Sequence, residues 1–114
     1  MIAVIFEVEP RPDHRQSYFD AAAALKPALL QVEGFLSVER FESLTTPGKL
    51  LSLSFFEDEA AVARWRALSA HRRTQSAGRD HIFQDYRLRV AAVLRDYGLN
   101  DRAEAPADSR AAHG

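Results

Sequence analysis

The sequence predicts an α+β fold in which a four-stranded antiparallel sheet carries two helices on one of its faces. Two observations support it. Segments with strand and helix patterns follow one another in the order β-α-β-β-α-β, and both helical segments have a single apolar stripe. This order is that of the ferredoxin-like arrangement. A chain of 114 residues forms one domain, which we expect at residues 1–98, followed by a flexible tail at residues 99–114 that is small, polar and aperiodic.

The first part of the chain predicts a strand and then a helix. Residues 2–9, IAVIFEVE, are rich in β-branched and aromatic residues and end at Pro10. Residues 12–31 begin with a proline, which suits a first helical turn. The apolar stripe expected on this helix consists of Phe19, Ala22, Ala23, Leu29 and Leu30. We expect Pro27 to kink or restart the helix, because proline has no backbone N–H to donate.

The middle of the chain predicts a hairpin and a second helix. Residues 35–43 and 50–57 have strand patterns, and the loop between them contains Pro47 and Gly48. In the second of these strands one face carries Leu51, Leu53 and Phe55. Residues 57–68 begin with acidic residues, which suit the positive end of a helix dipole. The stripe on this helix consists of Ala61, Val62, Trp65 and Leu68.

The last element fits two periodicities. Residues 81–98 contain apolar residues at helical spacing, but apolar residues also alternate with arginines in YRLRV at residues 86–90. The order of the preceding elements decides for a strand, because one more strand completes the sheet. We therefore predict a strand from about Tyr86 to Asp96.

Helices on one face of the sheet leave the other face bare, and that face includes apolar residues such as Ile5 and Phe41 or their neighbours. A large bare apolar face is an association surface. The simplest closed solution is a homodimer in which two sheets pack face to face around a two-fold axis.

Composition excludes several classes of function. The chain has no cysteine, so it has neither a disulfide, a thiolate metal site nor a thiol nucleophile. A net charge of −1 gives no overall attraction to nucleic acid or to an anionic membrane. The N-terminus lacks a basic signal region, and no apolar run approaches the roughly 20 residues needed to span a bilayer. We expect a cytoplasmic protein without a nucleic-acid or membrane partner.

Several short pieces together resemble a known family. They are VEGFLSVERFES at residues 32–43, LSLSFFEDEAAVARWR at 51–66, His71 six residues after the tryptophan, QSAGR at 75–79 and DYRLRV at 85–90. In this order and spacing they are similar to the antibiotic biosynthesis monooxygenase domain of the dimeric α+β barrel superfamily, over about residues 1–98. The resemblance implies a homodimeric barrel with a pocket between sheet and helices in each subunit. Characterised members oxidise polyketide or menadiol-like quinols without metal or flavin, and other relatives bind and degrade haem.

The residues fit an oxygenase that needs no cofactor. Triplet oxygen reacts slowly with closed-shell molecules, so a phenolate or quinol anion must itself supply an electron. His71 is the candidate base, because imidazole accepts a proton near neutral pH, and Arg79 or Gln75 would hold the oxyanion. The aromatic walls of the site would be Trp65, Phe6, Phe55, Phe83 and Tyr86. We therefore expect a monooxygenase that acts on a small electron-rich aromatic or quinol with molecular oxygen, with no metal.

Other interpretations stay open. Trp65 lies on the helix stripe and fits the core better than a ligand platform, His71 could cap the end of a helix, and Arg79 could face solvent. The same apolar pocket would serve a non-catalytic or regulatory homodimer that binds a small hydrophobic ligand. Haem-degrading relatives use an asparagine on the first strand and a histidine about three turns after the tryptophan. Here the first strand has no asparagine, and Gln75 stands ten residues after Trp65; only the tryptophan of that haem site matches.

Overall fold

The computed structural model describes residues 1–75 and 82–114, and the side chains of residues 1–69 and 82–114. The elements in chain order are β1 (Ile2–Pro10), the short 3-10 helix η1 (Pro12–His14), α1 (Arg15–Leu30), β2 (Phe35–Glu42), β3 (Leu50–Phe56), α2 (Glu59–Gln75), β4 (Phe83–Ala92) and α3 (Ala107–His113). The strands form one antiparallel sheet in the order β2-β3-β1-β4. The predicted ferredoxin-like α+β fold is confirmed.

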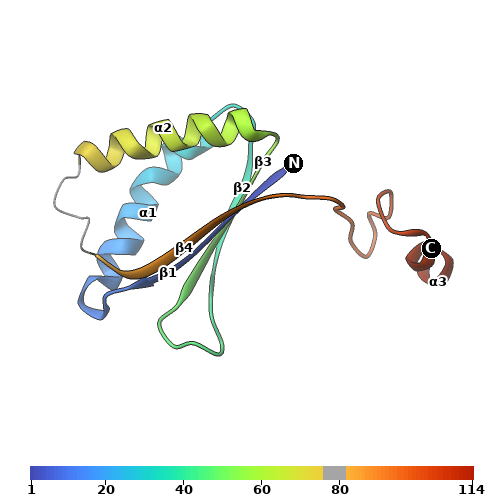
Figure 1. The fold of residues 1–114 in the computed structure, drawn as a ribbon, viewed down its shortest axis with the longest axis horizontal. Coiled ribbons are helices and arrows are strands. Elements are labelled where there is room, and N and C mark those ends of the chain that lie inside the picture. The colour runs from blue at the N-terminus through green and yellow to red at the C-terminus, as the bar shows by residue number, and fades with distance from the viewer. Residues whose placement is uncertain (76–81) are drawn as a thin grey trace.

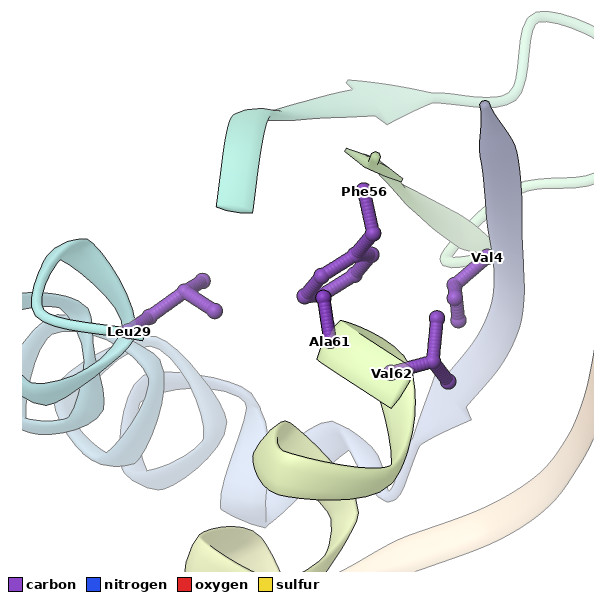
Figure 2. Close-up of a cluster of buried hydrophobic side chains, with 5 residues drawn as sticks. All are labelled: Val4, Leu29, Phe56, Ala61 and Val62. Atoms are coloured by element: carbon purple, nitrogen blue, oxygen red, sulfur yellow. The ribbon is translucent and has the colours of Figure 1, made fainter. Parts of the chain in front are cut away.

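The two long helices, α1 and α2, lie on the same side of the sheet (Figure 1). We call this side the helix face and the other side the open face. The core lies on the helix face in two clusters. The first contains Val4, Leu29, Phe56, Ala61 and Val62, which point toward one another from β1, α1, β3 and α2 (Figure 2). The second contains Val8, Tyr18, Leu50 and Ile82.

The pleat of β1 separates the two faces. Side chains alternate along a strand, so Val4, Phe6 and Val8 point to the helix face. Across the ladder to β4 the partners of these three residues are Val90, Leu88 and Tyr86. Ile5 lies between them and belongs to the open face, where its partner in β3 is Leu53.

β4 is shifted toward the N-terminus relative to the predicted strand at residues 86–96. It runs from Phe83 to Ala92. Its end is set by its partner, because Ala92 pairs with Ile2 at the start of β1. The amide of Val93 makes one further hydrogen bond, to the carbonyl oxygen of Met1, and the chain then leaves the sheet.

α1 differs from the sequence prediction in two ways. It continues through Pro27 to Leu30, so the predicted restart does not occur. The buried residues of α1 are Tyr18 and Leu29, whereas Leu30, which we placed on the apolar stripe, is 56% exposed. The row Tyr18, Leu25 and Leu29 has the spacing of seven and four residues that keeps side chains on one helix face.

The position of α2 over the sheet is fixed at its first turn. The Oδ1 atom of Asp58 accepts a hydrogen bond of 2.8 Å from the amide of Ala61, as an N-cap does. Gly34, just before β2, has a φ of +89°, and a Cβ built there would lie 2.7 Å from the Cβ of Ala61. Glycine at residue 34 therefore permits both the turn and the close approach of α2.

The segment after β4 projects away from the sheet and carries α3 (Figure 1). The sequence predicts a flexible aperiodic tail here, and the structure contains a short helix within it. Arg102 organises this segment. Its guanidinium donates hydrogen bonds to the carbonyl oxygens of Gly98 and Gly114, at 3.1 Å and 2.7 Å, and lies over the ring of Tyr97. Within the described ranges, no helix is long and apolar enough to cross a bilayer.

Candidate functional site

Three aromatic rings meet on the helix face where β1 ends and β4 begins. The ring of Phe6, from β1, has its centroid 5.9 Å from that of Phe83 and 5.7 Å from that of Tyr86. The rings of Phe83 and Tyr86 are 6.1 Å apart. These three residues, all predicted as walls of a site, form what we call the aromatic cluster.

A β-bulge brings Phe83 to this side of the sheet. Glu9 pairs with Asp85, and the next residue of β1, Pro10, pairs with Phe83, so Gln84 has no partner in the ladder. One extra residue in a strand reverses the direction of the side chains that precede it. The bulge therefore places Phe83 on the helix face.

Tyr18 of α1 packs against the aromatic cluster through Phe83. Its side chain is 6% exposed, and its ring centroid lies 5.9 Å from that of Phe83. Our sequence interpretation missed Tyr18, because it chose the helix stripe through Phe19. The spacing of Tyr18 to Leu25 and Leu29 is the signal that would have found it.

An apolar row continues from the cluster along β4. Tyr86, Leu88 and Val90 all point to the helix face, and they are 61%, 53% and 44% exposed. β4 is an edge strand, and the helices leave its apolar row uncovered. The aromatic cluster and the adjoining exposed apolar row together form a surface suited to a small hydrophobic ligand.

Trp65 lies on the same side of the sheet but belongs to the first core cluster. It is half-buried on α2 and packs against the group that contains Val4 and Val62. The core interpretation of Trp65 is therefore the one that its described contacts support.

Phe55 does not join the other predicted walls. It pairs with Ala3, an open-face residue of β1, whereas Phe6 pairs with Ser52. The pleat therefore sends Phe55 to the open face, and the expectation that Phe55 and Phe6 line one site is wrong. Periodicity showed which residues of one strand share a face, but only the register between strands shows which faces of β1 and β3 coincide.

The proposed catalytic residues lie at the limit of the described chain. His71 and Gln75 are on α2, which extends beyond the predicted end near residues 69–71, but their side chains are outside the described residues. Arg79 is outside the described residues altogether. Their roles remain predictions. Over the side chains that are described, no group of three or more His, Asp or Glu residues could hold a metal ion.

The open face carries a charged network instead of an aromatic cluster. Glu7 of β1 forms an ion pair of 3.1 Å with Lys49 and a second ion pair with Arg89 of β4. Hydrogen bonds from Lys49 and from Arg89 lower the pKa of Glu7 below its usual value. A hollow of about 190 Å³ beside this network is lined by Glu7, Val8, Glu9, Lys49, Asp85, Tyr86, Arg87 and Arg89. Three acidic and three basic side chains make it an unsuitable place for an apolar ligand.

Comparison with known proteins identifies the family. The family model described as antibiotic biosynthesis monooxygenase matches residues 1–77. The chain belongs to the antibiotic biosynthesis monooxygenase family. The curated protein named jasmonate monooxygenase ABM, from Pyricularia oryzae, is 42% identical over 101 residues, which are 89% of this chain and 47% of that protein. The chain thus spans about half the length of the curated relative it matches.

Solved structures share this fold. Rv0793 from Mycobacterium tuberculosis superimposes with a TM-score of 0.71 at 21% identity, over 85% of this chain and 98% of that chain. A variant of MhuD, solved with two manganese protoporphyrin IX molecules bound per active site, gives a TM-score of 0.65 at 18% identity, over 86% and 99% of the two chains. At these identities the likeness establishes the fold, and function must come from the site.

Proposed function

We propose that this antibiotic biosynthesis monooxygenase family member uses molecular oxygen to oxidise a small, electron-rich aromatic or quinol substrate. Family membership supports oxygen chemistry. The aromatic cluster of Phe6, Phe83 and Tyr86, which opens into the apolar row of β4, is the observation that carries the choice of a ring-containing substrate.

In this proposal the substrate supplies the electrons. His71 removes the proton of a phenol or of an activated C–H, and the resulting anion reduces oxygen. Arg79 and Gln75 hold the negative charge on the substrate oxygen. For a CH₂ group between two aryl rings, one oxygen atom enters the new carbonyl and the other leaves as water with the two hydrogens. This balance requires no added reductant and no resident cofactor.

Oxygen uptake with anthrone as the probe tests the proposal. Replacing His71 by alanine removes a general base, so we expect the enzymatic rate to fall about 10²-fold or more while anthrone binding changes little. His113→Ala, in α3 away from the sheet, is the matched control and keeps the wild-type rate. Thermal unfolding checks that both variants fold.

Equal oxygen uptake by the wild type and His71→Ala contradicts the role of His71. If the wild type binds anthrone but consumes no oxygen above the uncatalysed rate, the result favours a ligand-binding homodimer.

A second substrate class is favoured by one observation. The relative that is 42% identical is named for jasmonate, a cyclopentanone carboxylic acid with no aromatic ring. Hydroxylation of such a molecule consumes two electrons that the substrate does not supply, so this reaction needs an external reductant. Oxygen uptake with jasmonate that depends on added reductant, with no uptake on anthrone, would select this class.

We also propose that the protein acts as a cytoplasmic homodimer whose open faces pack together. Ile5, Leu53 and Phe55 are half-buried there in the single chain, and Phe41 is 43% exposed. Burial of this surface against a second copy would remove it from water.

A further inference from the structure

Tyr18 carries a polar group into an apolar part of the molecule. Its ring contacts Phe83 and Phe19, and it shares a core cluster with Val8 and Ile82. Only 6% of Tyr18 is exposed. Burial of this ring accounts for the packing, but it leaves the hydroxyl group to be explained.

The hydroxyl of Tyr18 has no hydrogen-bond partner among the residues that the structure describes. Among the described residues, every side-chain oxygen or nitrogen atom that is fully buried has a hydrogen-bond partner. The Tyr18 oxygen has none, so it is not fully buried and belongs to the 6% of the residue that is exposed. A buried tyrosine normally satisfies its hydroxyl, because an unpaired polar group costs free energy. An unpaired hydroxyl that reaches the surface of an aromatic cluster is therefore available to a ligand.

Tyr18 lies close to the aromatic cluster of Phe6, Phe83 and Tyr86. The ring of Phe83 has its centroid 5.9 Å from that of Tyr18 and 6.1 Å from that of Tyr86, so the two tyrosine rings are at most about 12 Å apart. Val8 links them too, because it packs with Tyr18 and pairs across the sheet with Tyr86. A flat ligand in contact with the ring of Phe83 would therefore lie near the Tyr18 side chain.

We propose that Tyr18 is a ligand-binding residue whose hydroxyl donates a hydrogen bond to an oxygen atom carried on the ring of the bound molecule. This inference rests on the proposed function for the nature of the ligand, and it narrows the substrate class to rings with a carbonyl, phenol or phenolate oxygen. A phenol donor fits all three, since each offers a lone pair. Apolar rings without oxygen would bind to the cluster but gain nothing from Tyr18.

Binding of two matched probes tests the inference without any reaction. Menadione has two carbonyl acceptors and no donor, and 2-methylnaphthalene has the same rings without oxygen. Menadione cannot be trapped by a thiol, because the chain has no cysteine. We expect Tyr18→Phe to weaken menadione binding by roughly 2- to 12-fold in equilibrium dialysis, the effect of one hydrogen bond, and to leave 2-methylnaphthalene unchanged. Tyr97→Phe, the same change in the C-terminal segment, alters neither affinity.

The outcomes separate this inference from the proposed function. Equal menadione affinity in the wild type and Tyr18→Phe overturns the role of Tyr18, as does a wild type that binds neither probe. A parallel loss for both probes, or a lower melting temperature of Tyr18→Phe, assigns Tyr18 to packing and also overturns the inference. If Tyr18→Phe weakens menadione alone while the wild type consumes no oxygen with anthrone, the inference stands and the proposed reaction fails.

Discussion

The rings of Phe83 and Tyr86 lie 6.1 Å apart on the helix face of β4, although residues three apart in an unbroken strand point to opposite faces. The bulge at Gln84 creates this relationship and thereby adds the ring of Phe83 to the aromatic cluster. The face on which a ring lies should therefore decide whether it affects a ligand.

Phe83→Leu should weaken the binding of an aromatic ligand such as menadione. The leucine keeps apolar volume but cannot make a ring contact with the ligand, and an aromatic pair is worth about 0.5–1.5 kcal/mol, or roughly 2- to 12-fold in affinity. Phe55→Leu is the same change on the open face, and we expect it to leave the affinity unchanged. Equilibrium dialysis of both variants measures this, and an equal loss in both would place the ligand elsewhere.

Gly34→Ala should destabilise the fold more than Gly48→Ala. Both glycines have positive φ, +89° and +82°, so each alanine costs about 1–2 kcal/mol of backbone strain. At Gly34 the new Cβ would also meet Ala61 at 2.7 Å, whereas nothing lies within 4 Å at Gly48. Urea unfolding of the two variants gives the difference. Equal losses would show that α2 can move away from Gly34 at little cost.

Acid should remove the contribution of Glu7 to stability. Lys49 and Arg89 lower the pKa of Glu7 in the folded state, so the folded state binds this proton less readily than the unfolded chain. The contribution is present above the unfolded pKa of about 4.3 and is lost as the pH falls through the lower folded value. The stability difference between the wild type and Glu7→Gln, measured by urea unfolding at a series of pH values, should shrink in that window. A stability difference that stays constant across that window would contradict the role of the two ion pairs.

Phe41→Glu should dissociate the proposed homodimer. Phe41 lies on the open face and is 43% exposed in the single chain, so a charge there is tolerated in a monomer but costly when buried against a second copy. Leu44→Glu, at a fully exposed position in the hairpin loop, is the control. Light scattering at micromolar concentration should give a dimer for the wild type and Leu44→Glu and a monomer for Phe41→Glu. A monomeric wild type would refute the dimer.

Arg102→Lys should loosen the C-terminal segment and leave the sheet unaffected. A lysine ammonium does not reproduce the planar fork by which Arg102 reaches Gly98 and Gly114. Backbone amides of residues 97–114 should then exchange with solvent faster, while the melting temperature of the sheet stays constant. Arg95→Lys is the control. If exchange is equally fast in the wild type, the segment is as flexible as the sequence predicts.

The order and type of the main elements could be predicted because each has its own local pattern. The alternation in β1 and the acidic first turn of α2 depend on neighbours within a few residues. The end of β4 depends on the length of β1, its distant partner, and the bulge at Gln84 depends on the pairing of the two strands. Such information is not contained in either segment alone.

The candidate site was predicted in part for the same reason. Phe6 and Tyr86 were chosen as aromatic residues in strands, and the register then brought them together. Phe55 met the same criterion but lies on the other face. Tyr18 was missed because two helix stripes, one through Tyr18 and one through Phe19, are a single residue apart, and only contacts with Phe83 and Val8 decide between them.

The alternation of β4 has a practical consequence for anyone who wishes to re-engineer this protein. Tyr86 and Leu88 lie on the helix face, where we propose that the substrate binds, whereas the intervening Arg87 and Arg89 belong to the opposite surface. A combinatorial library restricted to positions 86, 88 and 90 would vary selectivity without disturbing assembly. A library at positions 87, 89 and 91 would do the reverse, so the part of β4 that follows the bulge offers two independent sets of positions for directed evolution.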